Sequence, residues 1–215
     1  MLRKIIIVSL ALGFAVAAQA YMLNSSQVIG AQRMVLQLGY ANRNFGDQTT
    51  ANRAGAEVKL AYGLNDPWDA LFYINNGQYP DVAGQTYQSF GLDFEYGVIR
   101  GRPVDISLVL GGQVLKNLNG GAVVLEYTNW RLAALLGRSI KREDGVAIIT
   151  PYTGAKLEFI NPSTGAGSKD FEVLLGLKYG LNGALSVMLE GSYHWMFTNT
   201  TFGGSEIGFG VAWAI

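Results

Sequence analysis

The chain has 215 residues, of which 28 are glycine and only 15% are charged, and its formal net charge is zero. It contains no cysteine, which excludes disulfides, a thiol nucleophile and a thiolate metal site. A neutral chain has no electrostatic basis for non-specific nucleic-acid binding, so no nucleic-acid partner is expected. The charged fraction lies below the roughly 25% of soluble domains, yet the mean hydropathy is only +0.19, and an apolar-outside, polar-inside β-barrel would combine both properties.

The first residues have the pattern of a secretory signal peptide. A basic start at Arg3 and Lys4 precedes an apolar run, and Ala18-Gln19-Ala20 supplies a small-x-small cleavage site. A membrane-anchoring helix is the alternative, but the apolar run is shorter than the roughly 20 residues that cross a bilayer. We therefore expect a signal peptide at residues 1–20 and a mature barrel domain at residues 21–215.

Apolar and polar residues then alternate with a period of two, which is typical of half-buried β-strands. The clearest segments are residues 53–64, 90–98, 171–181, 185–195 and 206–215, and noisier ones are residues 30–40, 68–75, 104–115, 130–139 and 146–160. In the first, Leu60 and Tyr62 point to one face, while Glu57 and Lys59 point to the other. The pattern predicts about ten strands, or eight if two noisier segments fail.

Three positions carry local signals of their own. Pro151 lacks a backbone N–H and is expected to mark a bulge. Asn182-Gly183 is a preferred two-residue hairpin turn. Residues 120–129 change parity near Glu126, which leaves open either a bulged strand start or a loop that enters the interior.

The connections between the predicted strands alternate in length. Short turns are expected at residues 65–67, 100–102, 141–145 and 182–183, and longer polar links at residues 41–52, 76–86, 116–121, 161–169 and 196–204. Short periplasmic turns and long external loops are typical of outer-membrane barrels. Both ends of the mature chain are then expected on the periplasmic side.

Aromatic residues are predicted to form two belts at the membrane interfaces. The belt near the short turns comprises Tyr62, Trp68, Tyr96, Tyr179 and Trp213, and the belt near the long links comprises Tyr40, Phe72, Tyr87, Trp130, Phe159, Phe171, Tyr193 and Trp195. A soluble β-sandwich would also alternate, but it would expose its polar face. The belts and the many small inward residues favour an all-β, antiparallel, up-and-down transmembrane β-barrel.

This pattern resembles that of the small bacterial outer-membrane β-barrel proteins, the OmpA/OmpX/OmpW-like superfamily. The resemblance covers residues 30–215 and rests on the alternation, on the Gly-Leu-Lys-Tyr-Gly-Leu-Asn-Gly hairpin at residues 176–183, and on the closing strand. It implies a place in the outer membrane, contact with outer-membrane lipid, and recognition of the C-terminal strand by the barrel-assembly machinery. The chain departs from the usual aromatic end at Ile215, and Trp213 is a possible substitute.

Inward positions carry charges of both signs, and we expect them to form a network in the lumen. Its members are Arg33, Glu57, Lys59, Asp93, Glu95, Asp105, Arg131, Lys156, Glu158, Glu172, Lys178, Glu190, His194 and Glu206. Side chains fill the interior of a small barrel, and buried charges need partners, which favours a salt-bridged core. A narrow ion-conducting lumen is the alternative, although the signs are interleaved and form no selective rings.

Catalysis is the least favoured function. Glu190, Ser192 and His194 face one way on one strand, but they point into the lumen, and their order is the reverse of that in outer-membrane lipid-A deacylases. No metal-ligand spacing, phosphate-binding loop or dinucleotide fingerprint occurs, so neither catalytic residues nor a cofactor are expected. The expected role is structural or limited passive transport; the alternatives are a small-solute channel, a surface adhesin acting through its long loops, and a lipid-modifying enzyme.

Overall fold

The computed structural model describes residues 29, 31–45, 52–100, 103–141, 147–197 and 201–215. The expected signal peptide lies outside these ranges. The strands are β1 (Met34–Phe45), β2 (Arg53–Asn65), β3 (Trp68–Gln78), β4 (Gln85–Ile99), β5 (Asp105–Asn119), β6 (Ala122–Gly137), β7 (Ile140–Lys141), β8 (Ala147–Pro162), β9 (Ser168–Gly180), β10 (Leu185–Phe197) and β11 (Thr201–Ala214). Within these ranges, no helix has the length and apolarity needed to cross a membrane.

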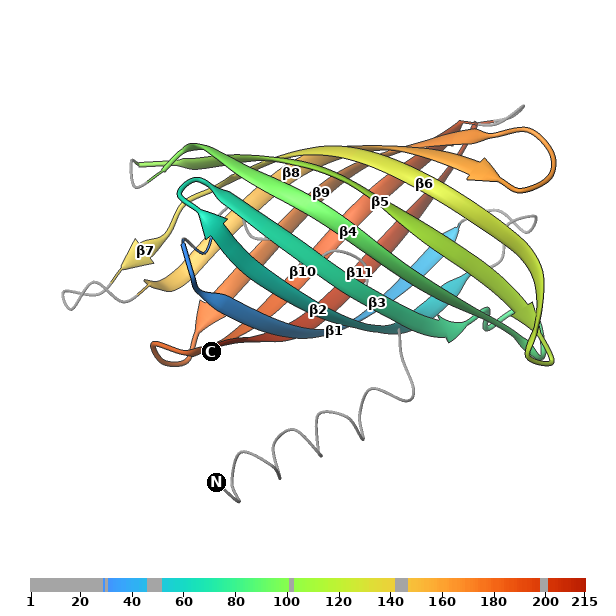
Figure 1. Ribbon diagram of the computed structural model, residues 1–215, viewed down its shortest axis with the longest axis horizontal. Helices are drawn as coiled ribbons and strands as arrows, with labels where there is room; N and C mark the ends of the chain where they lie inside the picture. Colours follow the sequence, from blue (N-terminus) through green and yellow to red (C-terminus); the bar gives the residue numbers. More distant parts are fainter. Residues whose placement is uncertain (1–28, 30, 46–51, 101–102, 142–146, 198–200) are drawn as a thin grey trace, which may run out of the picture.

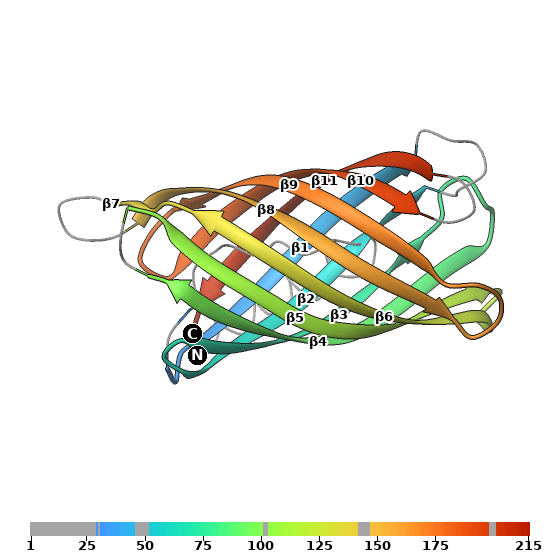
Figure 2. The ribbon, with the colours of Figure 1, turned by 90° about the horizontal axis from the view of Figure 1, so that it is seen from above.

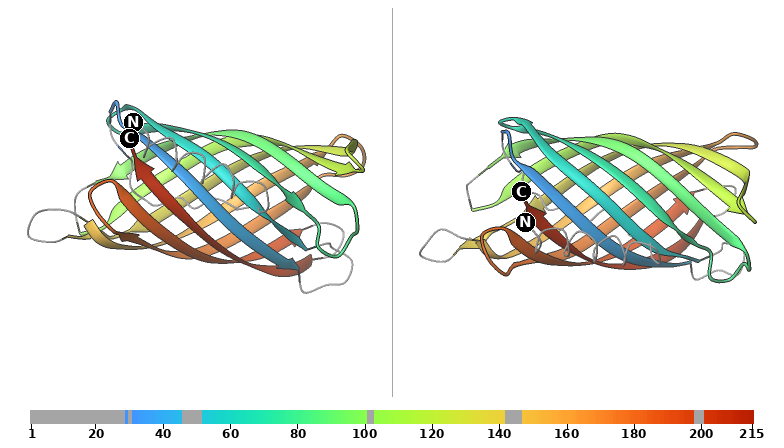
Figure 3. Two further views of the ribbon diagram at one scale, coloured as in Figure 1. Left: turned by 90° about the horizontal axis from the view of Figure 1, so that it is seen from below. Right: turned by 60° about the horizontal axis from the view of Figure 1, so that its bottom comes forward.

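The strands form one closed antiparallel barrel (Figures 1 and 2). Neighbours in sequence pair along the sheet, and β1 pairs with β11 from Val35↔Ala214 to Phe45↔Gly204. Figure 3 shows this seam, where the first and last strands lie side by side. The pairing of β6 with β8 completes the wall, and the short β7 prolongs β6 along β8. The wall therefore has ten strands, which confirms the predicted fold class and strand number.

Pro151, in β8, interrupts the backbone hydrogen bonding at the point where β6 ends and β7 begins. The Arg138 N–H donates to the Pro151 carbonyl at 3.0 Å, but proline has no N–H with which to return the bond. The pairing register is the same on both sides of this gap. The prediction of a bulge at Pro151 is therefore wrong, and the register shift lies further on, between Ile140 and Lys141.

Several strands continue well past the segments that alternation predicted. β5 and β6 have 15 and 16 residues, whereas a tilted membrane-crossing strand needs about 9–11. Their hairpin and the β8–β9 hairpin project at the right of Figure 1, and we call this the hairpin end. The opposite end, at the left, holds the links after β2, β4, β7 and β9 and is called the short-turn end. Much of the sequence predicted as long links, such as residues 76–86 and 116–121, is therefore strand.

The β5–β6 hairpin resolves the ambiguity at residues 120–129. Gly120 and Gly121 have φ of 57° and 86°, a left-handed conformation that suits a two-residue hairpin turn. The register shifts between Asn117 and Leu118 opposite β6. The parity change is thus a bulged strand start and no loop enters the interior there.

The β9–β10 link differs from the expected two-residue turn. It covers residues 181–184, between Gly180 and Leu185. The Asn182 Oδ1 accepts the backbone N–H groups of Ala184 and Leu185, each at 2.9 Å. An asparagine side chain therefore organises this turn, as in an Asx-turn.

Burial follows the inverse of the pattern of a soluble protein. Outward apolar side chains such as Leu175 and Ile74 are 68% and 64% exposed, while the inward Lys59 and Asp93 are 0% exposed. A soluble protein rarely buries Lys or Asp fully. An apolar outer face around a polar interior is the arrangement of a transmembrane barrel.

The charged interior as candidate functional site

The lumen gathers nearly all the predicted charged residues. Buried there are Glu57, Lys59, Asp93, Glu95, Asp105, Arg131, Lys156, Glu158, Glu172, Glu190, His194 and Glu206, and Lys178 is partly buried. The prediction for Arg33 is wrong: its side chain is exposed, because Arg33 precedes β1 at the short-turn end of the barrel.

Three interior charges were missed by the sequence analysis. Arg43, Asp69 and Asp170 are 2%, 1% and 0% exposed. Arg43 was assigned to a surface link, and Asp170 adjoins another, although both belong to strands. Asp170 shares the inward parity of Glu172, so extending the predicted segment by one residue would have found it.

Arg131 and Asp93 form the best-defined ion pair. The Arg131 Nε and Nη2 donate to the two Asp93 carboxylate oxygens at 2.9 and 2.7 Å, which is the bidentate geometry of strong arginine–carboxylate pairs. The guanidinium also lies 4.4 Å from the Tyr73 ring centroid. Nearby, Lys59 pairs with Glu57 at 3.1 Å.

Inward glycines hold the large side chains of the neighbouring strand. Tyr73 lies against Gly91 and Tyr152 against Gly176, so closely that an added Cβ would overlap the phenol. The two tyrosines pair directly with these glycines across the sheet. These two glycines therefore do not leave an open lumen, because a tyrosine ring of the neighbouring strand occupies the space beside each of them.

A second network surrounds His194 nearer the hairpin end. His194 Nδ1 lies 3.0 Å from an Asp170 oxygen, and its Nε2 lies 3.0 Å from the Ser192 hydroxyl. Arg43 donates from Nε to Glu206 at 2.7 Å and pairs with Asp170 at 3.5 Å. His194 and Asp170 are both 0% exposed.

Lys156 extends this network along the wall, from β9 through β8 toward β6 and β5. It pairs with Glu172 and lies 3.8 Å from Glu158. The side-chain amides of Gln113 and Asn129 donate to Glu158 at 3.1 and 2.9 Å. Charges from β8 and β9 are thus bonded to polar groups of β5 and β6, on the adjoining wall.

Two clusters of apolar side chains share the interior with the charges. Toward the short-turn end, Tyr152 and Leu135 belong to a buried cluster completed by Val109, Ala133, Leu174, Met188 and Ala212. Toward the hairpin end, Tyr79, Tyr87 and Leu115 form a second cluster with Val82 and Tyr127 packed on it. Arg53 lies 5.6 Å from the centroids of both buried tyrosine rings. We call these the inner and outer caps.

The described residues include no group of three or more His, Asp or Glu arranged to hold a metal ion. Their interior charges instead pair with one another across strands. Arg43, Arg131 and Lys156 each pair with a buried carboxylate, so both signs of charge occur along the interior.

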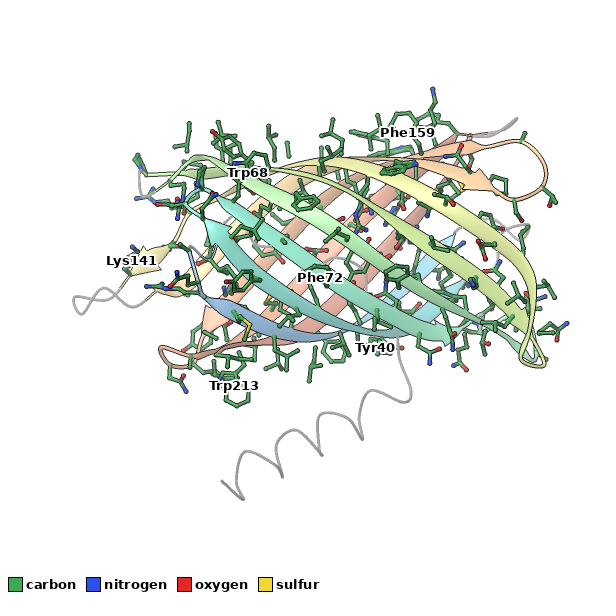
Figure 4. All side chains as sticks on the ribbon, in the orientation of Figure 1. Tyr40, Trp68, Phe72, Lys141, Phe159 and Trp213 are labelled. Carbon is green, nitrogen blue, oxygen red and sulfur yellow. The ribbon has the colours of Figure 1, made fainter. Side chains whose placement is uncertain are left out.

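The outward aromatic residues form ring pairs along the barrel. Trp68 packs on Tyr96 at 4.7 Å between centroids, and Trp195 packs on Tyr193 at 4.7 Å and on Phe171 at 5.8 Å. In Figure 4, Trp68 and Trp213 lie near the short-turn end, and Tyr40 and Phe159 lie further toward the hairpin end. The expected belt residues Tyr62, Trp130 and Tyr179 are also exposed, at 38%, 59% and 43%.

Two residues do not lie in the predicted belt. Phe72 is exposed but lies near the middle of the barrel in Figure 4, because β3 continues to Gln78 and the belt position falls later in the strand. Tyr87 is 3% exposed and belongs to the outer cap. Since Phe90 faces outward, a residue three positions earlier must face inward.

Comparison with known proteins identifies the fold but no family. No protein-family model matches the chain, and no curated protein matches it. Among solved structures, the β domain of the Bordetella autotransporter BrkA has a TM-score of 0.54 and 12% identity, covering 86% of this chain and 100% of that one. The translocator domain of NalP from Neisseria meningitidis has a TM-score of 0.52 and 11% identity, covering 84% and 87%.

A third similar structure is a bacterial polysaccharide outer-membrane secretin. Its TM-score is 0.52 at 6% identity, and the match covers 83% of this chain but 64% of that one. The present chain thus spans less than two thirds of that protein. All three are bacterial barrels of the outer-membrane type, and at such low identity the likeness concerns the fold alone.

Proposed function

We propose that this protein is a closed, non-conducting barrel of the bacterial outer membrane with a structural role in the envelope. The observation that carries the proposal is the packing of the lumen. The two caps and the charge network together occupy the interior, and their central side chains are buried. A small barrel filled in this way has no continuous aqueous path.

Conductance across a planar bilayer tests this proposal. The full chain would be produced in a Gram-negative bacterium, extracted from the membrane fraction with detergent and checked for a heat-dependent gel shift, which reports a folded barrel. We expect no steady openings from the wild-type protein. Steady single-channel currents from the folded wild type would overturn the proposal in favour of a small-solute channel.

A variant with opened caps serves as the positive control for the expected absence of single-channel current. Replacing Tyr152, Leu135, Tyr79 and Tyr87 with alanine removes the largest side chains of both caps. We expect this variant to conduct if it retains the gel shift. The matched control replaces outward residues Leu132, Leu136, Tyr179 and Tyr193, which are all exposed, and should stay silent. If both variants fold and neither conducts, the caps are not what closes the lumen.

A second candidate function, acyl hydrolysis, is favoured by one observation. Ser192, His194 and Asp170 are hydrogen-bonded in series at 3.0 and 3.0 Å, which is the order of a nucleophile, a base and an orienting carboxylate. We rank it second because the imidazole is fully buried and Asp170 also pairs with Arg43. A structural hydrogen-bond chain accounts for the same geometry.

A fluorophosphonate probe separates these two explanations. It reacts with an activated serine hydroxyl, so the structural explanation predicts no labelling of the folded protein. Labelling that disappears in Ser192→Ala and weakens in His194→Gln would instead establish an activated nucleophile. Ser186→Ala, which changes another inward serine of β10, is the matched control.

A further inference from the structure

We infer that the short-turn end carries a basic rim that binds the phosphate groups of anionic phospholipids. The inference goes beyond the closed barrel and does not depend on whether the lumen conducts. It rests on the placement of exposed charges relative to the outward aromatic residues.

The exposed charges of the short-turn end are mostly positive. In the part of the chain that the structure describes, the charged side chains are Arg33, Arg100, Arg138 and Lys141 against one acidic side chain, Asp66, which pairs with Arg100. Figure 4 labels Lys141 at this extremity of the barrel. These residues come from three places in the chain, before β1, after β4 and in the segment from the end of β6 through β7.

The hairpin end has a smaller excess of positive charge. There the exposed charges of the described residues are Lys116, Lys169 and Asp81, and Arg53 and Glu126 are partly exposed, which leaves an excess of one positive charge. Lys116 and Glu126 also pair with each other at 3.4 Å, with both side chains nearly half exposed. The two ends of the barrel therefore differ in net exposed charge, although the whole chain is neutral.

The aromatic residues place this rim at the level of lipid headgroups. Trp68 and Trp213 lie near the short-turn end (Figure 4), and amphipathic rings prefer the headgroup region of a bilayer. Arg100 follows β4 four residues after Tyr96, the ring partner of Trp68. Guanidinium groups at that depth meet phosphodiesters, which they bind in a bidentate manner.

Zwitterionic lipids also carry phosphates, so charge is the discriminating property. Each basic residue near an anionic membrane surface contributes enough to enrich anionic lipid severalfold. We therefore expect phosphatidylglycerol to be enriched about threefold to tenfold over phosphatidylcholine at the short-turn end. At the hairpin end we expect weaker enrichment.

Tryptophan quenching by brominated lipid measures each end separately, because the chain has only four tryptophans. A Trp130→Phe/Trp195→Phe variant reports from Trp68 and Trp213, and a Trp68→Phe/Trp213→Phe variant reports from the other pair. Each is placed in bilayers of brominated phosphatidylcholine with increasing phosphatidylglycerol. Relief of quenching gives the relative lipid affinity at that end.

Neutralising the rim provides the decisive comparison. Arg100→Gln/Arg138→Gln/Lys141→Gln should abolish the preference reported by Trp68 and Trp213, whereas Lys116→Gln/Lys169→Gln should leave it unchanged. High salt should weaken it in the same way. Equal lipid preference at both ends, or a preference that survives neutralisation in the folded variant, would overturn the inference.

Discussion

At the scale of single residues, the interior depends on pairs of a glycine and a large side chain on adjacent strands. Tyr152 occupies the space beside Gly176, and its hydroxyl donates to Glu190 at 3.0 Å. The Cβ added by Gly176→Ala would displace the Tyr152 ring and weaken its hydrogen bond to Glu190. We therefore expect the unfolding free energy to fall by about 1–3 kcal/mol. Denaturant titration of the barrel in detergent measures it. Gly183→Ala is the control, since an added Cβ there meets nothing within 4 Å.

The Arg131–Asp93 pair makes a second prediction at this scale. Arg131→Met leaves a fully buried carboxylate without its cation, and removing one partner of such a pair costs about 3–5 kcal/mol. Adding Asp93→Asn removes the orphaned charge, so the double variant should recover most of the loss. A double-mutant cycle by denaturant titration provides the check. A double variant as unstable as the single one would show that the buried carboxylate is not the cause.

At the scale of elements, the break between β6 and β7 has one cause, the missing N–H of Pro151. Pro151→Ala supplies that donor to the Arg138 carbonyl without altering the interior, because residue 151 faces outward. We expect about 0.5–1.5 kcal/mol of stabilisation and slower amide exchange at residues 138–140. Pro162→Ala, at the end of β8, should not slow exchange there. Unchanged exchange in Pro151→Ala would mean that the ladder is broken for another reason.

The element scale also shows what the sequence could and could not predict. The alternation at residues 53–64 and 185–195 anticipated β2 and β10 closely, since one face of each meets lipid and the other a polar interior. Strand segments beyond the membrane have two wetted faces and lose that signal, which is why residues 116–119 were assigned to a link. Arg43 was missed for a related reason: the inner face of its segment is buried, but the outward residues Asn42 and Asn44 are polar, so the segment shows no alternation.

Side-chain contacts between neighbouring strands could not be predicted from the sequence, for a different reason. The inward direction of Tyr152 follows from parity once β8 is identified, but its place over Gly176 depends on the register between β8 and β9. Register is fixed by the closed sheet as a whole. The hydrogen bond between His194 and Asp170 has the same origin, because it joins β10 to β9.

At the scale of the whole molecule, stability should reside in the closed wall and filled lumen between the caps, while the projecting strands add little. The β5–β6 hairpin tests this division. Its tip exposes Val123 and Val124 at 54% and 57%, and residues 122–126 of β6 pair with β5 but lie beyond the ladder shared with β8.

Replacing residues 117–125 with Asn-Gly should therefore preserve the fold. The substitution keeps Leu115 and Tyr127 of the outer cap and supplies a favourable two-residue turn. We expect the heat-dependent gel shift to persist and the unfolding free energy to fall by about 1 kcal/mol, since the main buried contact removed is the hydrogen bond that the Tyr79 hydroxyl donates to Asn117. Val109→Asp, which places a charge in the fully buried inner cap, should cost several times more. If trimming the hairpin instead abolished the gel shift, the projecting strands would be required for the barrel to form, and the division between a stable wall and dispensable extensions would be wrong.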